Sequence, residues 1–146
     1  MALAMQADDL SAVLKDEFMQ VAGDFRIDHV EERAIAMRLI ASDRHLRPGG
    51  TVSGPAMFAL ADVAAYLMTL AMIGPKALAV TTNCSIDFMR KPVADVDVVA
   101  KGRLLKLGRQ FSVSDVLLFS EGQSEPVARA GLTYAIPPER SAAASA

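Results

Sequence analysis

The sequence of 146 residues has no tryptophan, one cysteine and two histidines, and only 5% of its residues are aromatic. The single cysteine, Cys84, excludes an intramolecular disulfide and a cysteine-rich metal site, and it favours a reducing, cytoplasmic location. The net charge of −2 and the shortage of rings for base stacking argue against a nucleic-acid-binding surface. The sequence therefore predicts a protein with no bound metal and no nucleic-acid partner.

Apolar residues are abundant, at 52% of the chain, which is enough for one domain with a substantial core. The segment at residues 1–10 lacks the basic and apolar regions of a signal peptide. The longest apolar stretch, residues 55–73, approaches the length of a membrane span. Its central Asp62 and its many small residues favour a buried core helix instead, so we expect no membrane association.

The N-terminal half predicts a helix followed by a strand. Apolar residues at helical spacing predict a short amphipathic helix within residues 8–24, with Gly23 as its stop. Alternation of apolar and polar residues predicts one long strand across residues 25–42. Four further alternating segments predict strands, the last three as a meander, within residues 77–92, 96–110, 111–123 and 126–137.

A turn-rich loop at residues 42–55 separates the first strand from a long helix. Gly54 is expected as the helix N-cap and Pro55 as its first residue, and Gly74 with Pro75 ends it. A helix that is apolar on nearly every face must be covered on nearly every face. We therefore expect an α+β fold in which one antiparallel sheet wraps around one long central helix. The expected segments are a helical one at 1–24, the domain at 25–137 and a disordered tail at 138–146.

The order of these elements resembles the hotdog fold, and the residues resemble the acyl-CoA thioesterases of the phenylacetate-degradation (PaaI-like) type across residues 25–137. That family carries a loop of the form N-x-x-G-x-x-H-G-G, followed by an acidic residue eight positions after the first glycine of H-G-G. The same register here is R-P-G-G-T-V-S-G-P, residues 47–55, and the acidic residue is Asp62. Three positions depart from the family pattern, namely Arg47 for Asn, Ser53 for His and Pro55 for Gly.

The resemblance implies hydrolysis of an acyl-CoA thioester, with coenzyme A as part of the substrate and no separate cofactor. It implies Asp62 as general base or nucleophile, and the Gly54 N–H at the helix N-terminus as the group that polarises the carbonyl. The family site spans two chains, so we expect a homodimer or a homotetramer. Further positions carried over are Thr81 to orient water, with Thr82 and Asn83 as neighbouring alternatives, Gly50 and Ser53 for the substrate, and Arg90 and Lys91 for the coenzyme A phosphates.

Each of these residues also has a purely structural interpretation. Asp62 could be a buried carboxylate bonded to a nearby loop or to Tyr66, and Gly54 could simply start a helix. In the strand at residues 80–88, alternation places Thr81 on the face of Asn83 and away from Cys84, which is expected to be inert core. The basic run that includes Arg90 and Lys91 could be a solvated sheet edge.

Arg47 is the departure with the most open outcomes. It could bond the thioester oxygen, clamp a carboxylate on the acyl group, pair with Asp62 or remain solvated. The first function we expect is therefore hydrolysis, and the alternative is an acyl-CoA-binding accessory protein that is catalytically weak. Hydration of an enoyl thioester is less consistent with the sequence, because no histidine follows Asp62 within the next few residues.

Overall fold

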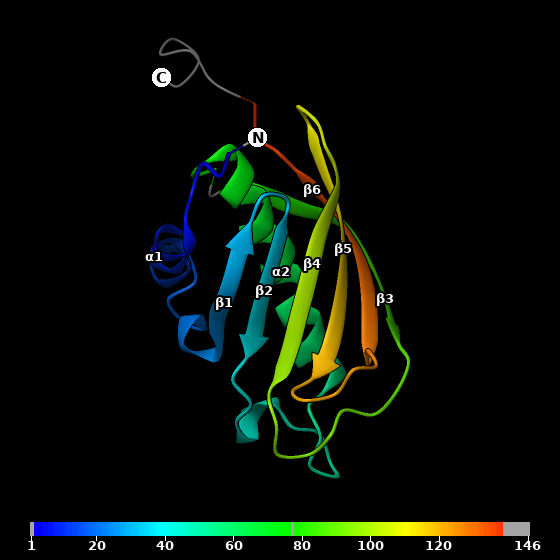
Figure 1. Ribbon diagram of the computed structural model, residues 1–146. Helices are drawn as coiled ribbons and strands as arrows, with labels where there is room; N and C mark the ends of the chain where they lie inside the picture. The colour runs from blue at the N-terminus through cyan, green and yellow to red at the C-terminus, as the bar shows by residue number, and fades with distance from the viewer. Residues whose placement is uncertain (1, 77, 139–146) are drawn as a thin grey trace.

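A computed structural model describes residues 2–76 and 78–138 (Figure 1). The elements are α1 (Ala7–Glu17), β1 (Phe25–Glu31), β2 (Ala34–Leu39), α2 (Gly54–Ile73), β3 (Val80–Phe88), β4 (Val98–Leu107), β5 (Phe111–Ser120) and β6 (Ala128–Ala135), with short 3-10 helices at Ala22–Asp24 and Asp43–His45. The predicted tail, residues 138–146, lies outside the described residues apart from Pro138.

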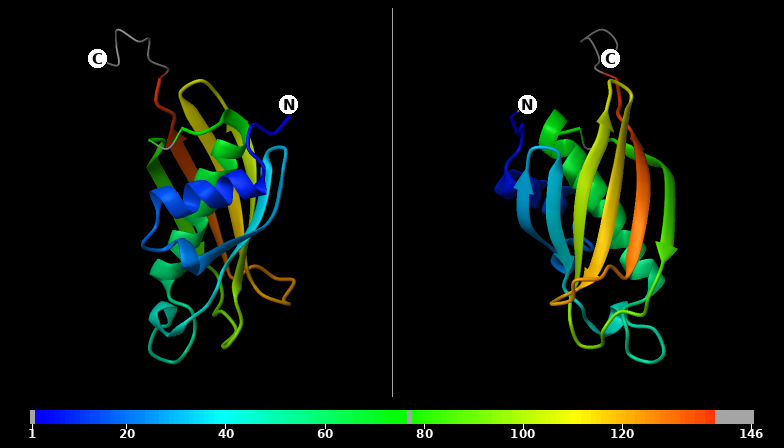
Figure 2. Two further views of the ribbon diagram at one scale, coloured as in Figure 1. Left: turned by 90° about the vertical axis from the view of Figure 1, so that its left-hand side faces the viewer. Right: turned by 45° about the vertical axis from the view of Figure 1, so that its right-hand side comes forward.

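The strands form one six-stranded antiparallel sheet in the order β1-β2-β4-β5-β6-β3. The sheet curls around α2, and α1 packs beside β1 and against the same central helix (Figures 1 and 2). Successive strands β4, β5 and β6 are neighbours, so the predicted meander is confirmed. The arrangement is the α+β hotdog fold expected from the sequence.

The prediction of one strand across residues 25–42 was wrong, because this segment folds as a hairpin. Strands β1 and β2 pair antiparallel with Glu31 opposite Ala34, so Glu32 and Arg33 form the turn. Arg33 has a φ of 62°, the left-handed conformation that such a tight turn requires. No Gly or Asn marks the turn in the sequence, and the apolar positions before it (Phe25, Ile27) resume in the same phase after it (Ile35, Met37), which is why the hairpin was not predicted.

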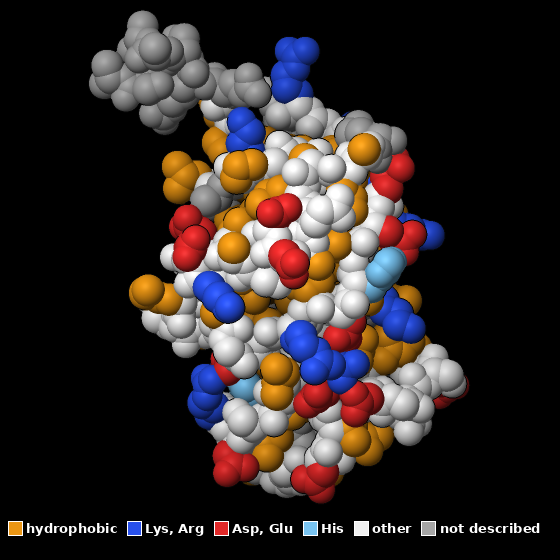
Figure 3. Space-filling view, turned by 60° about the vertical axis from the view of Figure 1, so that its left-hand side comes forward, with side chains coloured by type: hydrophobic (Ala, Val, Ile, Leu, Met, Phe, Trp, Pro, Cys, Tyr) orange, Lys and Arg blue, Asp and Glu red, His pale blue; other side chains and the backbone are white. Residues whose placement is uncertain are grey.

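The first helix is shorter than predicted. It ends at Glu17 with Phe18 as the C-cap, well before the expected stop at Gly23. Leu10 and Leu14 are buried in the core cluster, so α1 shares its core with the sheet domain. On the side of the molecule that carries α1, acidic and basic side chains are interspersed among apolar ones (Figure 3).

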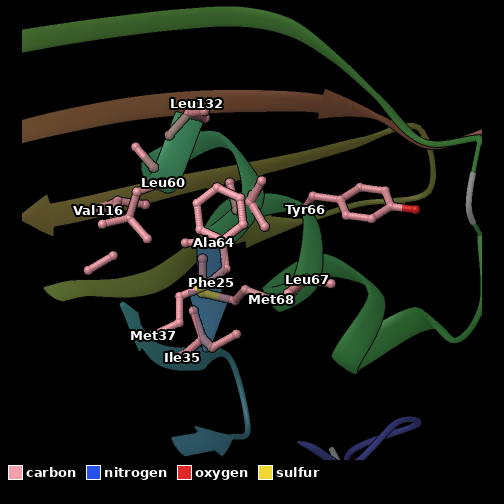
Figure 4. Packing of buried hydrophobic residues seen from close by; sticks show 14 of the residues in the cluster. Phe25, Ile35, Met37, Leu60, Ala64, Tyr66, Leu67, Met68, Val116 and Leu132 are labelled. Carbon is pink, nitrogen blue, oxygen red and sulfur yellow. The ribbon is translucent and has the colours of Figure 1, made fainter. Parts of the chain in front are cut away.

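The central helix α2 is the core of the molecule. Thirteen of its 20 residues are buried, and its side chains Leu60, Ala64 and Met68 lie among inward-facing side chains of the strands (Figure 4). By length and composition α2 is the one described helix that could cross a membrane, but 72% of its apolar window is buried inside the protein. The buried position of α2 therefore agrees with the prediction of a core helix. Gly74 is the C-cap, as predicted.

One buried polar contact ties α2 to the sheet. The Thr69 hydroxyl donates to the Ala65 carbonyl at 2.8 Å, and its oxygen also lies 2.8 Å from Ser112 Oγ on β5. Both residues are 1% exposed, so water does not compete for these hydroxyls. A buried hydroxyl that loses its partner keeps the full cost of its desolvation.

Thr69→Val should therefore lower the free energy of unfolding by about 1–3 kcal/mol, because it leaves the Ser112 hydroxyl buried without its partner. Valine is nearly isosteric with threonine, so no large cavity forms. Adding Ser112→Ala should recover part of this loss. Urea denaturation of both single variants and the double variant measures the coupling, and strictly additive losses would show that the two hydroxyls do not interact.

Candidate active site

The loop before α2 is held in one conformation by its own backbone. The Ser53 N–H donates to the His45 carbonyl at 2.8 Å, and the Arg47 N–H donates to the Thr51 carbonyl at 2.9 Å. Gly50 has a φ of 83°, which a residue with a side chain adopts only with strain. The glycine-rich segment is thus a tight turn that delivers the chain to the N-terminus of α2.

A buried polar cluster braces this loop against the start of β1. Asp24, 6% exposed, pairs with Arg44, and its second oxygen lies 3.4 Å from His45 Nε2. His45 Nδ1 accepts the Ser42 N–H at 3.1 Å and lies 3.2 Å from the Ser42 hydroxyl. This Ser–His–Asp series does not make a nucleophile, because the Ser42 backbone occupies the ring nitrogen and Arg44 offsets the Asp24 charge. Its role is to hold the loop.

The N-cap of α2 is Ser53 and not Gly54 as predicted. The Ser53 oxygen accepts the Ala56 N–H at 3.2 Å, with Ser53 in an extended conformation. A serine oxygen caps a helix better than glycine, which has no side chain to offer. Gly54 is consequently the first helical residue. Its N–H has no acceptor among the residues that the structure describes, and it lies at the positive end of the helix dipole.

A cavity of about 490 Å³ opens at this helix end. It brings together four of the predicted site residues, Arg47, Gly54, Arg90 and Lys91. Phe88 also lines it and covers the glycine, since a Cβ built on Gly54 would lie 3.3 Å from Phe88 Cζ.

The positive charge at this cavity is partly compensated. Arg90 pairs with Glu125 at 2.8 Å and donates to the Pro126 carbonyl. Within residues 2–76 and 78–138, Arg47 forms no salt bridge, so the predicted alternative in which it pairs with Asp62 is not what this structure shows. Gly50 lines a separate cavity of about 240 Å³ and not this one.

Asp62 lies two turns along α2, half-buried, and accepts two hydroxyl donors on one oxygen. Thr81 Oγ1 donates to Asp62 Oδ1 at 2.6 Å, and the Tyr134 hydroxyl lies 2.7 Å from the same oxygen and 3.0 Å from the Asp62 carbonyl. Two donors compensate much of the desolvation that a carboxylate in an apolar helix suffers. Thr81 therefore contacts Asp62 directly.

A β-bulge puts Thr81 in this position. Thr81 pairs with Tyr134 and Asn83 pairs with Thr133, so Thr82 is an extra residue in β3. The extra residue reverses the alternation, and Thr81 joins the inward face of Cys84 while Asn83 is exposed. The prediction that Thr81 shares the face of Asn83 was wrong for this reason. Asn83 thus points away from Asp62.

Tyr134 was not predicted as a site residue. It lies on β6, is 4% exposed and stands next to Thr81 across the strand pair. Burial, and then the Asp62 charge, raise the pKa of Tyr134 well above its usual range, so the phenol remains a donor at physiological pH. Only the register between β3 and β6 identifies it, and a single sequence does not give that register.

Gly54 and Asp62 lie far apart along one helix. They are separated by eight residues of continuous helix. At a rise of about 1.5 Å per residue, this separation is about 12 Å along the axis. A base and an oxyanion donor must both lie within about 3 Å of the groups that react at one carbonyl. A site that used both groups would therefore need them from two protomers, as two half-sites, one at Gly54 and one at Asp62.

The sequence of this chain matches a known protein family. A sequence model of the thioesterase superfamily matches residues 49–127. The chain belongs to the thioesterase superfamily. The protein is therefore a thioester hydrolase, and the family match covers Gly54, Asp62 and Thr81 but begins after Arg47 and ends before Tyr134. No curated protein sequence matches this chain.

Solved structures of thioesterases resemble this one closely. A candidate thioesterase from Silicibacter sp. TM1040 is 57% identical, with a TM-score of 0.89 over 94% of this chain and 96% of that chain. The phenylacetic acid degradation protein PaaI from Thermus thermophilus is 28% identical, with a TM-score of 0.70 over 82% and 98%. A thioesterase protein from Streptococcus pneumoniae, solved with coenzyme A, is 21% identical, with a TM-score of 0.74 over 88% and 99%. The resemblance to PaaI-like thioesterases is confirmed.

Cys84 can report on Asp62 without any assay of turnover. Burial, and then the Asp62 charge, raise the pKa of the Cys84 thiol above its usual range. The rate of Cys84 alkylation, measured as a function of pH, should therefore reach half of its maximum at a higher pH than for a free cysteine. Asp62→Asn removes only the charge, so it should lower that midpoint without restoring the usual value.

The control for this measurement is Asp87→Asn, which neutralises an exposed carboxylate on the same strand and should leave the midpoint in place. A midpoint that is the same in wild type and Asp62→Asn would contradict an ionised Asp62 beside Cys84.

Proposed function

We propose that this protein hydrolyses acyl-CoA thioesters at sites that two protomers share, each site combining Gly54 of one protomer with Asp62 of the other. The observation that carries the proposal is the separation of about 12 Å between these residues along one rigid helix. The coenzyme A bound to the Streptococcus pneumoniae relative supports this class of substrate.

Strand β3 offers the surface through which two protomers would meet. It is an edge strand, and Val80 and Phe88 at its two ends are 56% and 51% exposed. An edge strand with open backbone groups is a template for pairing with another chain. Two copies of β3 that pair antiparallel across a two-fold axis near Cys84 place Val80 of one protomer opposite Phe88 of the other.

This pairing brings the two half-sites together. Thr81, beside Val80, holds Asp62, and Phe88 covers Gly54. The axis therefore carries the Gly54 end of one protomer to the Asp62 region of its partner, and symmetry creates two such sites per dimer. We propose a homodimer, or a homotetramer built from two such dimers, in the cytoplasm.

Hydrolysis then follows from the groups at each shared site. The thioester carbonyl oxygen accepts the free Gly54 N–H, and the helix dipole stabilises the negative charge that develops on it. The Asp62 carboxylate takes a proton from water as the water attacks, or attacks the carbonyl itself before water releases the acid. The coenzyme A thiolate leaves and is protonated. Arg90 and Lys91 line the cavity and supply positive charge for the phosphates.

A second candidate function is an acyl-CoA-binding accessory protein with weak catalysis. The contact between Phe88 and Gly54 favours it, because the ring packs against Gly54 and fills part of the space at this helix end. Binding of acyl-CoAs without release of free thiol, across a panel of acyl groups, would support this second function over hydrolysis.

Mixing two inactive variants tests the shared site. Asp62→Asn and Gly54→Pro should each abolish hydrolysis, the latter because proline has no N–H while its ring is well tolerated at the start of a helix. After subunit exchange of equal amounts, half of the dimers are mixed, and each mixed dimer has one intact site. Activity should therefore recover to about one quarter of wild type.

Gly54→Ala is the matched control, because it adds a Cβ at the same place but keeps the N–H. It should retain more activity than Gly54→Pro by about 100-fold, the typical effect of one oxyanion donor. No recovery in the mixture, although size-exclusion chromatography shows mixed dimers, would contradict a shared site.

Arg47 lines the Gly54 cavity without a salt bridge among the described residues, and we propose that it contacts the acyl carbonyl or a carboxylate on the acyl group. Arg47→Ala should then lower kcat/KM, with a loss of transition-state stabilisation of about 2–4 kcal/mol. Arg47→Lys keeps the positive charge but loses the planar guanidinium with its paired donors. It should therefore retain only part of the wild-type kcat/KM. An Arg47→Asn variant that is faster than wild type on every acyl-CoA tested would contradict this role.

A further inference from the structure

The hydrogen bonds around Asp62 are asymmetric. Both donors, Thr81 Oγ1 and the Tyr134 hydroxyl, lie on Oδ1, at 2.6 Å and 2.7 Å. Across the part of the chain that the structure describes, no donor reaches Oδ2. One oxygen of the carboxylate is thus fixed and the other is left available.

We propose that Tyr134 is a positioning residue of the hydrolase, which with Thr81 fixes Asp62 Oδ1 so that Oδ2 alone faces the water or the thioester. This inference rests on the proposed function of Asp62. Tyr134 itself is 4% exposed, so it acts through Asp62 and does not touch the substrate.

The Tyr134 hydroxyl has one proton, two Asp62 oxygens as acceptors within reach, and the Thr81 hydroxyl beside it. The Asp62 carboxylate at 2.7 Å is closer and more strongly charged than the Asp62 carbonyl at 3.0 Å, so the proton lies on the bond to Oδ1. Burial and the Asp62 charge raise the pKa of Tyr134, so this donor is retained into alkaline conditions.

Packing fixes the Tyr134 ring from the other side. Its centroid lies 5.9 Å from the Tyr66 ring, and Tyr66 in turn meets Phe18 edge-on at 5.4 Å. These three rings form a row that runs from the end of α1 through α2 to β6. A ring held by aromatic neighbours keeps its hydroxyl in place with little loss of entropy when the substrate binds.

The two donors depend on one another through the sheet. Thr81 and Tyr134 are directly paired across β3 and β6, and they are so because Thr82 bulges. Side chains at paired positions lie close enough for their hydroxyls to converge on one atom. The bulge therefore creates both hydrogen bonds at once, which gives it a function beyond bending the edge strand.

Tyr134→Phe tests the proposal, because it removes only the hydroxyl. It should lower kcat roughly ten-fold or more with little change in KM, since a hydrogen bond to a charged group is lost while substrate contacts remain. Thr81→Val should act in the same direction and Thr81→Ser should restore activity.

The matched control is Tyr66→Phe, which removes a hydroxyl from the neighbouring ring of the row and should leave kcat in place. A Tyr134→Phe variant with wild-type kcat would overturn the proposal. So would an equal loss of kcat in Tyr66→Phe, or a rise in KM as large as the loss of kcat, since either would indicate a purely structural effect. Asp62→Asn separates the two hypotheses: an active Asp62→Asn variant removes the proposed function, whereas an inactive one together with a normal Tyr134→Phe removes only the role of Tyr134.

Discussion

The burial of α2 is the constraint on which the rest of this structure depends. A helix that is apolar on almost every side has to be surrounded, and a single sheet does so only by curling from β1 round to β3, with α1 beside it. The far end of that curl, β3, has a neighbour on one side only. Asp62 faces this incompletely covered side, where Thr81 reaches it. A carboxylate is tolerated in the core helix because it lies where the cover is thinnest and hydroxyl donors are at hand.

Local sequence information bears on one part of the candidate site and not on the other. The eight-residue spacing between Gly54 and Asp62 lies within one continuous helix, so helical geometry fixes their relation, and Arg47, Arg90 and Lys91 line one cavity beside Gly54. The surroundings of Asp62 depend on strand register. One extra residue, Thr82, turns Thr81 inward, and alternation of apolar residues does not reveal such a bulge.

The fold shows the same division between local and long-range information. The buried helix, its end at Gly74 and the meander β4-β5-β6 follow from composition, periodicity and turn residues. The β1–β2 hairpin was missed because its turn residues, Glu32 and Arg33, give no turn signal. Ser53 was missed as the N-cap although serine is a favoured cap, because the following Gly–Pro pair carries a strong start signal of its own.

The rigidity of α2 is also the physical reason for proposing a site that two chains share. A continuous helix holds a free N–H and a carboxylate about 12 Å apart, and no side-chain rotation brings them to one carbonyl. Bending the helix would expose the apolar surface of α2 that the sheet covers. In the proposed dimer, a two-fold axis beside β3 supplies the missing half from a second copy, with each half already fixed, Gly54 by the Ser53 cap and Asp62 by Thr81 and Tyr134. In the proposed dimer, the interaction that makes the monomer stable is thus also the one that leaves each monomer catalytically incomplete.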